Sequence, residues 1–141
     1  MEKIVLKGRG VVPGIAEGEA LVCPRSITGW NGVDPATGII KDASSEHRGK
    51  SIKGTIMVLP GSRGSNGWSC YLTATRASGS APAGWLFTRI DSSGAVASSL
   101  LKIPTVVDFP GDQDPCEMIE TGDHVRVDGT TGVVEITKKR I

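Results

Sequence analysis

The chain has 141 residues and a mass of 14.7 kDa, the size of one domain that buries a hydrophobic core without disulfides or metal. Its 16 basic and 15 acidic residues leave a net charge of +1. This balance provides no excess of cations to neutralise the phosphates of a duplex, so nucleic-acid binding is not expected. The apolar runs are far shorter than the roughly 18 residues that a membrane span needs, and the first eight residues do not resemble a signal peptide.

The cysteine pattern argues against a disulfide framework. Cys23, Cys70 and Cys116 are odd in number and widely spaced, and no CxxC pair is present. We therefore expect small buried or half-buried thiols and no metal ligands in this chain. A reduced, cytoplasmic setting follows as the expected location.

Short apolar stretches punctuated by glycine and proline predict a strand-rich domain. The chain has 19 glycines and 8 prolines, and only 4% of its residues are aromatic, so its core must be aliphatic. The predicted strands, in chain order, cover residues 2–6, 16–22, 54–60, 85–90 and 105–107, with a late hairpin of 124–127 and 133–136. Residues 8–10 are expected to end the first strand, and 29–38 form a loop.

Helices are predicted between these strands. They cover residues 69–77 and 94–101, with a helical turn at 115–119, and Ser65, Asn66 or Ser69 could cap the first of them. Strands and helices in this order predict an α+β fold, a barrel-like or layered sheet with a few short helices. No boundary interrupts residues 1–141, so a single domain is expected.

The loop at 59–67, Leu-Pro-Gly-Ser-Arg-Gly-Ser-Asn-Gly, is the best candidate for chemistry. It follows a strand predicted to be buried on both faces and precedes a predicted helix, a place where α/β folds bind anions. Arg63 offers a guanidinium fork for carboxylate or phosphate, and the hydroxyls of Ser62 and Ser65 could bind a ligand or act as a base. The loop lacks the Gly-Lys-Ser/Thr ending of a phosphate-binding P-loop, and from the pattern alone a plain polar turn is the alternative.

Other polar residues are weaker candidates. His47 is expected to be a loop residue, and His124 a solvent-facing residue of the hairpin. A group of carboxylates could bind a cation, but its spacing matches no EF-hand, so a solvated loop is expected; its members are Asp108, Asp112, Asp114 and Glu117.

Two tryptophans fall in predicted loops. Trp30 and Trp68 would be costly there unless each packs against something. Each is therefore a candidate for a site wall or an interface.

Blocks along nearly the whole chain resemble the swivel-domain small subunit of the aconitase X family. They are residues 8–20 (GRGVVPGIAEGEA), 29–38 (GWNGVDPATG), 60–65 (PGSRGS), 80–83 (SAPA), 103–108 (IPTVVD) and 121–127 (TGDHVRV). The resemblance implies a swivelling β/β/α domain that works with a separate large subunit. That subunit is expected to hold a [4Fe-4S] cluster and most of the site for a small anionic substrate.

The family also implies an activity, that of a hydro-lyase. Archaeal-type members dehydrate (R)-5-phosphomevalonate to trans-anhydromevalonate 5-phosphate on a mevalonate route to isoprenoids, and bacterial relatives dehydrate cis-3-hydroxy-L-proline. In aconitases a serine of the swivel domain abstracts the proton beside an arginine that holds the substrate. For this sequence the resemblance implies that Ser62 is the base, with Ser65 as the second candidate for that role. It also implies that Arg63 and the N–H groups of Gly64 and Ser65 hold anionic oxygens of the substrate.

Two features leave alternatives open. The loop departs from the family's serine-rich pattern at residues 66–68 (NGW). The sequence therefore does not decide between phosphomevalonate and hydroxyproline as the substrate. Residues 12–18 (VPGIAEG) also resemble the swivelling phosphohistidine domain of phosphoenolpyruvate-utilising enzymes, but the matching place for its histidine, residues 79–83 (GSAPA), has none. A non-catalytic binding domain is the third reading, because fold alone does not fix function.

Overall fold

The computed structural model describes residues 2–28, 31–63 and 68–139. Within them, eight strands form one sheet in the order β1-β8-β7-β3-β4-β5-β6-β2. The strands are β1 (Lys3–Lys7), β2 (Arg9–Val12), β3 (Ile15–Val22), β4 (Ile56–Leu59), β5 (Gly84–Phe87), β6 (Thr105–Val107), β7 (His124–Asp128) and β8 (Val133–Thr137). The helices are α1 (Trp68–Ser78), α2 (Ser92–Leu101) and α3 (Pro115–Met118). The expected α+β fold with a barrel-like sheet is confirmed.

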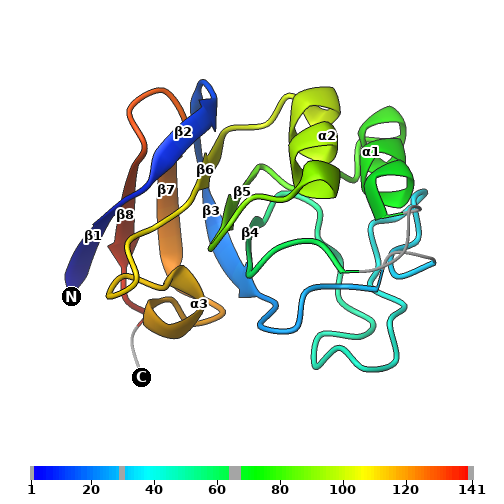
Figure 1. The fold of residues 1–141 in the computed structure, drawn as a ribbon. Coiled ribbons are helices and arrows are strands. Elements are labelled where there is room, and N and C mark those ends of the chain that lie inside the picture. Colours follow the sequence, from blue (N-terminus) through cyan, green and yellow to red (C-terminus); the bar gives the residue numbers. More distant parts are fainter. Residues whose placement is uncertain (1, 29–30, 64–67, 140–141) are drawn as a thin grey trace.

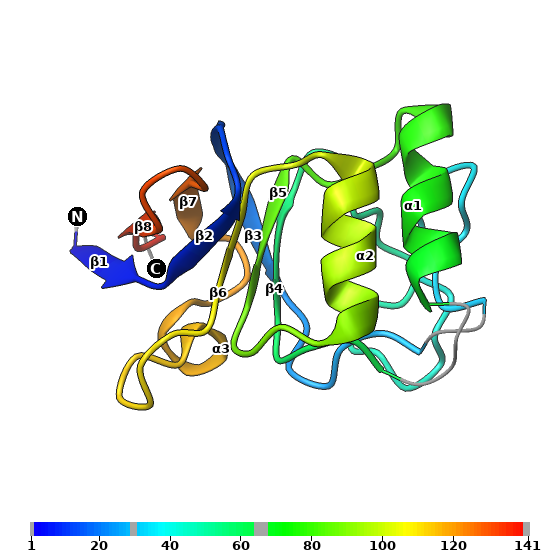
Figure 2. The same ribbon diagram turned by 45° about the horizontal axis from the view of Figure 1, so that its top comes forward.

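The elements form three layers (Figure 1 and Figure 2). Strands β3, β4, β5 and β6 run parallel to one another in the middle. Strands β1, β8 and β7 pair antiparallel on one side, while α1 and α2 lie on the other side (Figure 2). None of the described helices is long and apolar enough to cross a membrane.

The middle strands are buried on both faces, as the continuous apolar run at 54–60 predicts. Met57 and Leu59 face the helices in one core cluster, while Ile56 and Val58 face the antiparallel strands in the other. All four residues of β4 have 0% exposure. This two-sided burial holds the carboxyl end of β4 in a fixed place.

A strand that the sequence did not predict forms one edge of the sheet. The stretch at 8–10 was expected to end the first strand, but Arg9–Val12 forms β2, which pairs with β6 while β1 pairs with β8. The chain crosses between the layers at Gly8, where an added Cβ would lie 2.6 Å from the Val107 carbonyl oxygen. Glycine is read as a breaker from sequence, but here it permits close backbone approach between two strands.

Trp68 belongs to the core and not to a loop. It begins α1, is 1% exposed, and stacks on Trp85 with ring centroids 5.7 Å apart. Since α1 begins at Trp68, Ser69 lies inside the helix and does not precede it. Ser65, Asn66 and Trp30 lie outside the described residues.

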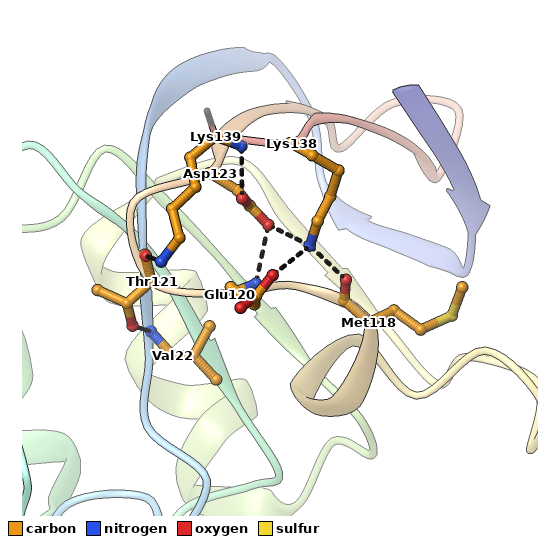
Figure 3. Close-up of polar contacts among 7 residues, drawn as sticks. All are labelled: Val22, Met118, Glu120, Thr121, Asp123, Lys138 and Lys139. Atoms are coloured by element: carbon orange, nitrogen blue, oxygen red, sulfur yellow. Dashed lines mark hydrogen bonds and ion pairs between the residues drawn. The ribbon is translucent and has the colours of Figure 1, made fainter. Parts of the chain in front are cut away.

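A buried ion pair joins the start of β7 to the C-terminal segment (Figure 3). The Asp123 carboxylate, 0% exposed, accepts hydrogen bonds from Lys138 Nζ at 2.6 Å and from the backbone N–H groups of Glu120 and Lys139. Beside it, Thr121 Oγ1 accepts from the backbone N–H of Val22 at 3.0 Å, at the end of β3. The start of the sequence block at 121–127 thus ties β7 to β3 and to the C-terminal segment.

Candidate functional site

The candidate site lies at the carboxyl edge of the parallel strands. The segments that leave β3, β4, β5 and β6 meet there, and backbone hydrogen bonds tie them together: Arg89 donates to the Pro60 carbonyl at 3.3 Å, and Asp108 to the Phe87 carbonyl at 3.2 Å. The Ser26 hydroxyl donates to the Gly61 carbonyl at 2.6 Å. Carboxyl edges of parallel sheets are where α/β proteins bind ligands.

Ser62 lies three residues beyond the end of β4 and faces Asp91, the residue immediately before α2. Its hydroxyl and its backbone N–H both donate to Oδ2 of Asp91, each at 2.9 Å. The other Asp91 oxygen, Oδ1, accepts from the N–H of Gly94 at 2.8 Å and so caps α2. One carboxylate therefore fixes both the predicted base and the start of a helix.

Arg63 is anchored by a different carboxylate. Its Nη1 donates to Ser44 Oγ at 3.1 Å and lies 3.5 Å from Oδ2 of Asp42. Asp42 also accepts from Ser44 and from the backbone N–H of Thr28. Burial opposes ionisation of Asp42, but these hydrogen bonds and the nearby guanidinium hold the pKa of its carboxyl below the ordinary value.

The anchoring leaves the Arg63 guanidinium available to a ligand. The Arg63 side chain is 44% exposed, whereas that of Asp42 is 6% exposed. In the structure Arg63 turns toward Asp42 and Ser44, and the Ser62 hydroxyl meets the carboxylate of Asp91.

A hollow of about 320 Å³ opens beside Arg63, on the side of Ser44. Its walls come from the segments that follow β3 and from the loop around residue 45: Cys23, Pro24, Arg25, Ser26, Ser44, Ser45 and Glu46. Ser26 holds a left-handed backbone conformation, with φ of 59°, which is uncommon for a residue with a side chain. Its bond to Gly61 thus couples this wall to the Ser62 loop.

Two of the predicted ligand residues, Gly64 and Ser65, lie outside the described residues. The serine of the block at 80–83 is far from Ser62 in the fold, since Ser80 precedes β5 and therefore lies at the amino edge of the sheet. It is 3% exposed and shares a hydrogen bond with Ser78 at 2.7 Å. The block at 80–83 therefore contributes a buried serine to the packing at the amino edge, away from Ser62.

The two histidines do not join the site. His47 is a loop residue, as predicted, but a buried one, 6% exposed, whose Nε2–H donates to the Val22 carbonyl at 2.7 Å. His124 faces solvent on β7 as expected, 3.0 Å from Glu17.

Two of the four carboxylates in the candidate cation group have separate structural partners. Asp108 pairs with Arg9, and Asp114 caps α3 while accepting from Thr88. Across residues 2–28, 31–63 and 68–139, no group of three or more His, Cys, Asp or Glu residues could hold a metal ion.

Each cysteine has a distinct environment. Burial raises the pKa of the Cys23 thiol to about 12 and that of Cys116 to about 11, so both stay protonated near neutral pH. Cys70 is exposed on α1, contrary to the expectation of buried or half-buried thiols. The described residues thus provide no thiolate set suited to an iron–sulfur cluster.

Sequence reasoning missed both anchoring carboxylates, Asp42 and Asp91. Each lies far from the loop along the chain, 21 residues before Arg63 and 29 residues after Ser62 (63 − 42 and 91 − 62). One local signal existed: Asp91 stands just before the predicted helix, where an N-cap aspartate is common.

The three-layer fold, with a serine and an arginine presented at one edge of its parallel strands, is that of a swivelling β/β/α domain with a small polar site. The chain belongs to the aconitase X swivel domain family, whose model matches residues 5–136. This membership confirms the family resemblance drawn from the sequence blocks.

Curated relatives match over nearly their full length. The protein named phosphomevalonate dehydratase small subunit from Methanocella arvoryzae is 36% identical over 132 residues, covering 94% of this chain and 98% of the relative. The protein of that name from Thermococcus kodakarensis is 38% identical over 131 residues, covering 93% and 95%.

Solved structures share the fold. The crystal structure of Thermococcus kodakaraensis aconitase X in its holo-form superposes with a TM-score of 0.86 and 37% sequence identity, covering 96% of this chain and 99% of that one. The solution structure of a UPF0107 protein gives a TM-score of 0.84 at 35% identity, covering 96% and 100%. Both agree with the three-layer arrangement described above.

Proposed function

We propose that this chain is the small subunit of a hydro-lyase that dehydrates (R)-5-phosphomevalonate to trans-anhydromevalonate 5-phosphate, on a mevalonate route to isoprenoids. The supporting observation is the similarity, 36–38% identity over more than nine-tenths of the chain, to proteins named phosphomevalonate dehydratase small subunit. The proposal includes one swivel domain over residues 1–141 and a cytoplasmic location.

Within this proposal, Ser62 takes the proton from the substrate carbon. Arg63, with the N–H groups of Gly64 and Ser65, holds anionic oxygens of the substrate. The position of Ser62 and Arg63 at the carboxyl edge of β4, together with the exposed part of the Arg63 guanidinium, supports these roles.

A large subunit completes the enzyme. The name "small subunit" of the relatives supports such a partner. We place the [4Fe-4S] cluster in that partner, where it would bind the departing hydroxyl, since the described residues of this chain offer no ligand set for it. This chain contributes Ser62 as the base and Arg63 as the cationic side chain. The molecule that it binds, besides the large subunit, is a small anionic substrate, and neither a nucleic acid nor a membrane.

The alternative classes receive less support. A phosphocarrier would need a histidine at 79–83, where Ser80 is buried at the edge opposite Ser62. The dehydration of cis-3-hydroxy-L-proline remains the second candidate, because residues 66–68 depart from the family's serine-rich pattern.

The test is a dehydration assay. The chain is produced together with its large subunit under anaerobic conditions and offered each of the two substrates. Turnover of (R)-5-phosphomevalonate that falls at least about 100-fold in Ser62→Ala, a typical cost of losing a general base, supports the function and the base. Ser99→Ala, an exposed serine of α2, is the matched control and keeps full activity. Turnover of the hydroxyproline alone, or equal activity in Ser62→Ala, contradicts the proposal.

A further inference from the structure

Asp91 carries more contacts than a helix cap needs. It precedes α2 with an extended backbone, φ −119° and ψ 178°, and its Oδ1 accepts the N–H of Gly94. That single bond fulfils the capping role. The second oxygen, Oδ2, is left for another partner.

Oδ2 of Asp91 binds Ser62 twice. The backbone N–H and the hydroxyl of Ser62 both donate to it at 2.9 Å, from a loop 29 residues earlier in the chain. Gly61 makes room for this contact, since an added Cβ there would lie 3.1 Å from Oδ2. The N–H bond fixes the loop, and the O–H bond fixes the direction of the hydroxyl hydrogen.

The surroundings of Ser62 leave Asp91 as the group that can receive its proton. Within the described part of the chain, the hydroxyl bonds to Asp91, while the neighbouring Arg63 is engaged with Asp42 and Ser44. A serine hydroxyl is a weak base and nucleophile unless an adjacent base takes its proton. Asp91 is exposed, so it can exchange a proton with solvent afterwards.

We propose that Asp91 is the positioning residue for Ser62 and accepts its hydroxyl proton during dehydration. The inference rests on the proposed function, in which Ser62 is the base. As the substrate C–H bond breaks, its proton goes to Ser62 Oγ while the original Ser62 proton passes to Asp91 Oδ2. The C–H electron pair forms the new C=C bond, and the hydroxyl leaves with the C–O pair, taking a proton from solvent to become water. Asp91 then returns its proton to solvent, and the reaction is proton-neutral.

This assignment also explains why a carboxylate faces a catalytic serine. A permanent alkoxide 2.9 Å from a carboxylate would be disfavoured by the repulsion of two negative charges. A neutral hydroxyl that transfers its proton only as it receives another avoids that repulsion. The two charges never coexist on the pair.

The test uses variants that keep the helix cap. Asparagine and serine are both good N-cap residues, but neither can accept the Ser62 proton as a carboxylate does. In the assembled enzyme, we expect Asp91→Asn and Asp91→Ser to lower kcat at least about 100-fold with KM within about threefold of wild type. Thermal unfolding and copurification with the large subunit should match wild type. Asp114→Asn, a cap variant on α3, is the control and keeps full activity.

A second measurement separates proton transfer from a structural effect. If Asp91 acts through Ser62, then Asp91→Asn lowers the residual rate of Ser62→Ala by less than about twofold, because residues that act as a unit are non-additive. An equal loss in both backgrounds would overturn the proposal. Full activity of Asp91→Asn with an impaired Ser62→Ala also overturns it, and leaves the proposed function standing. Full activity of Ser62→Ala would instead remove the proposed base itself.

Discussion

Arg63 and the buried Asp42 form the ion pair of the candidate site, with Nη1 of the arginine 3.5 Å from Oδ2 of the aspartate. The carboxylate and the Ser44 hydroxyl both contact Nη1, and 44% of the Arg63 side chain is exposed and can face a ligand. An arginine fixed in this way keeps the flat, forked donor set that suits carboxylate and phosphate oxygens.

The first prediction concerns Arg63→Lys in the assembled enzyme. A lysine ammonium keeps the charge but cannot span Asp42, Ser44 and a substrate anion together, so we expect KM to rise about 10-fold or more, the loss of one charge-assisted hydrogen bond. Steady-state kinetics measures this change. Arg76→Lys, whose arginine donates to Leu100 on the helix layer, should leave KM unchanged. An unaltered KM in Arg63→Lys would show that Arg63 does not contact the substrate.

The sequence predicted most of the fold because the local patterns are strong. The run of Ile56–Leu59 between glycine and proline and the alternation of the late hairpin both became the expected strands. The strand Arg9–Val12 was missed because Gly8 before it and Gly10 within it permit close backbone contact, a tertiary effect that a local pattern reads as a break.

The candidate site was only half predictable. Ser62 and Arg63 stand in a recognisable loop, but the groups that orient them, Asp91 and Asp42, come from other segments and meet them only in the folded chain. Trp68 was misread for a related reason. Its loop-like neighbours hide that it starts α1 and packs on Trp85.

The second prediction compares two stacked tryptophans. Trp68 Nε1 is buried and has no hydrogen-bond partner among the described residues, whereas Trp85 Nε1 donates to Ser98 Oγ at 3.0 Å. Trp68→Phe removes an unsatisfied donor along with some volume, so it should lower the free energy of unfolding by about 1 kcal/mol. Trp85→Phe also breaks a buried hydrogen bond and should cost about 1 kcal/mol more. Urea unfolding of the two variants checks the order, and an equal or reversed order contradicts this explanation.

The third prediction concerns acid stability and the Asp123–Lys138 pair (Figure 3). Burial opposes ionisation of Asp123, but hydrogen bonds from Lys138, Glu120 and Lys139 lower the pKa of its carboxyl below the ordinary 3.8. A lowered pKa means that the stabilisation is fully present above pH 3.8 and is lost as the pH falls through the lower, folded-state value. At neutral pH Asp123→Asn should cost about 2–3 kcal/mol, somewhat less than a fully buried pair because the Lys138 side chain is 16% exposed.

Denaturant unfolding at a series of pH values measures that loss. The gap in unfolding free energy between wild type and Asp123→Asn should be constant from pH 7 down to about 5 and narrow below 3.8. Asp112→Asn, in an exposed loop, provides the control. A gap that stays constant down to pH 2 would exclude ionised Asp123 as its source.

The last prediction is the order in which the three thiols react. The thiolate is the reactive form, and burial raises the pKa of Cys23 to about 12 and of Cys116 to about 11. Cys70 is exposed on α1. At pH 8 the folded chain should therefore take up one equivalent of a maleimide rapidly, and all three only after unfolding. Mass spectrometry of the native protein locates the label, and Cys70→Ser should abolish the rapid phase. Rapid labelling of Cys23 or Cys116 would mean that the segments after β3 and around α3 open readily, and that the wall of the hollow beside Arg63 is not held as the structure describes.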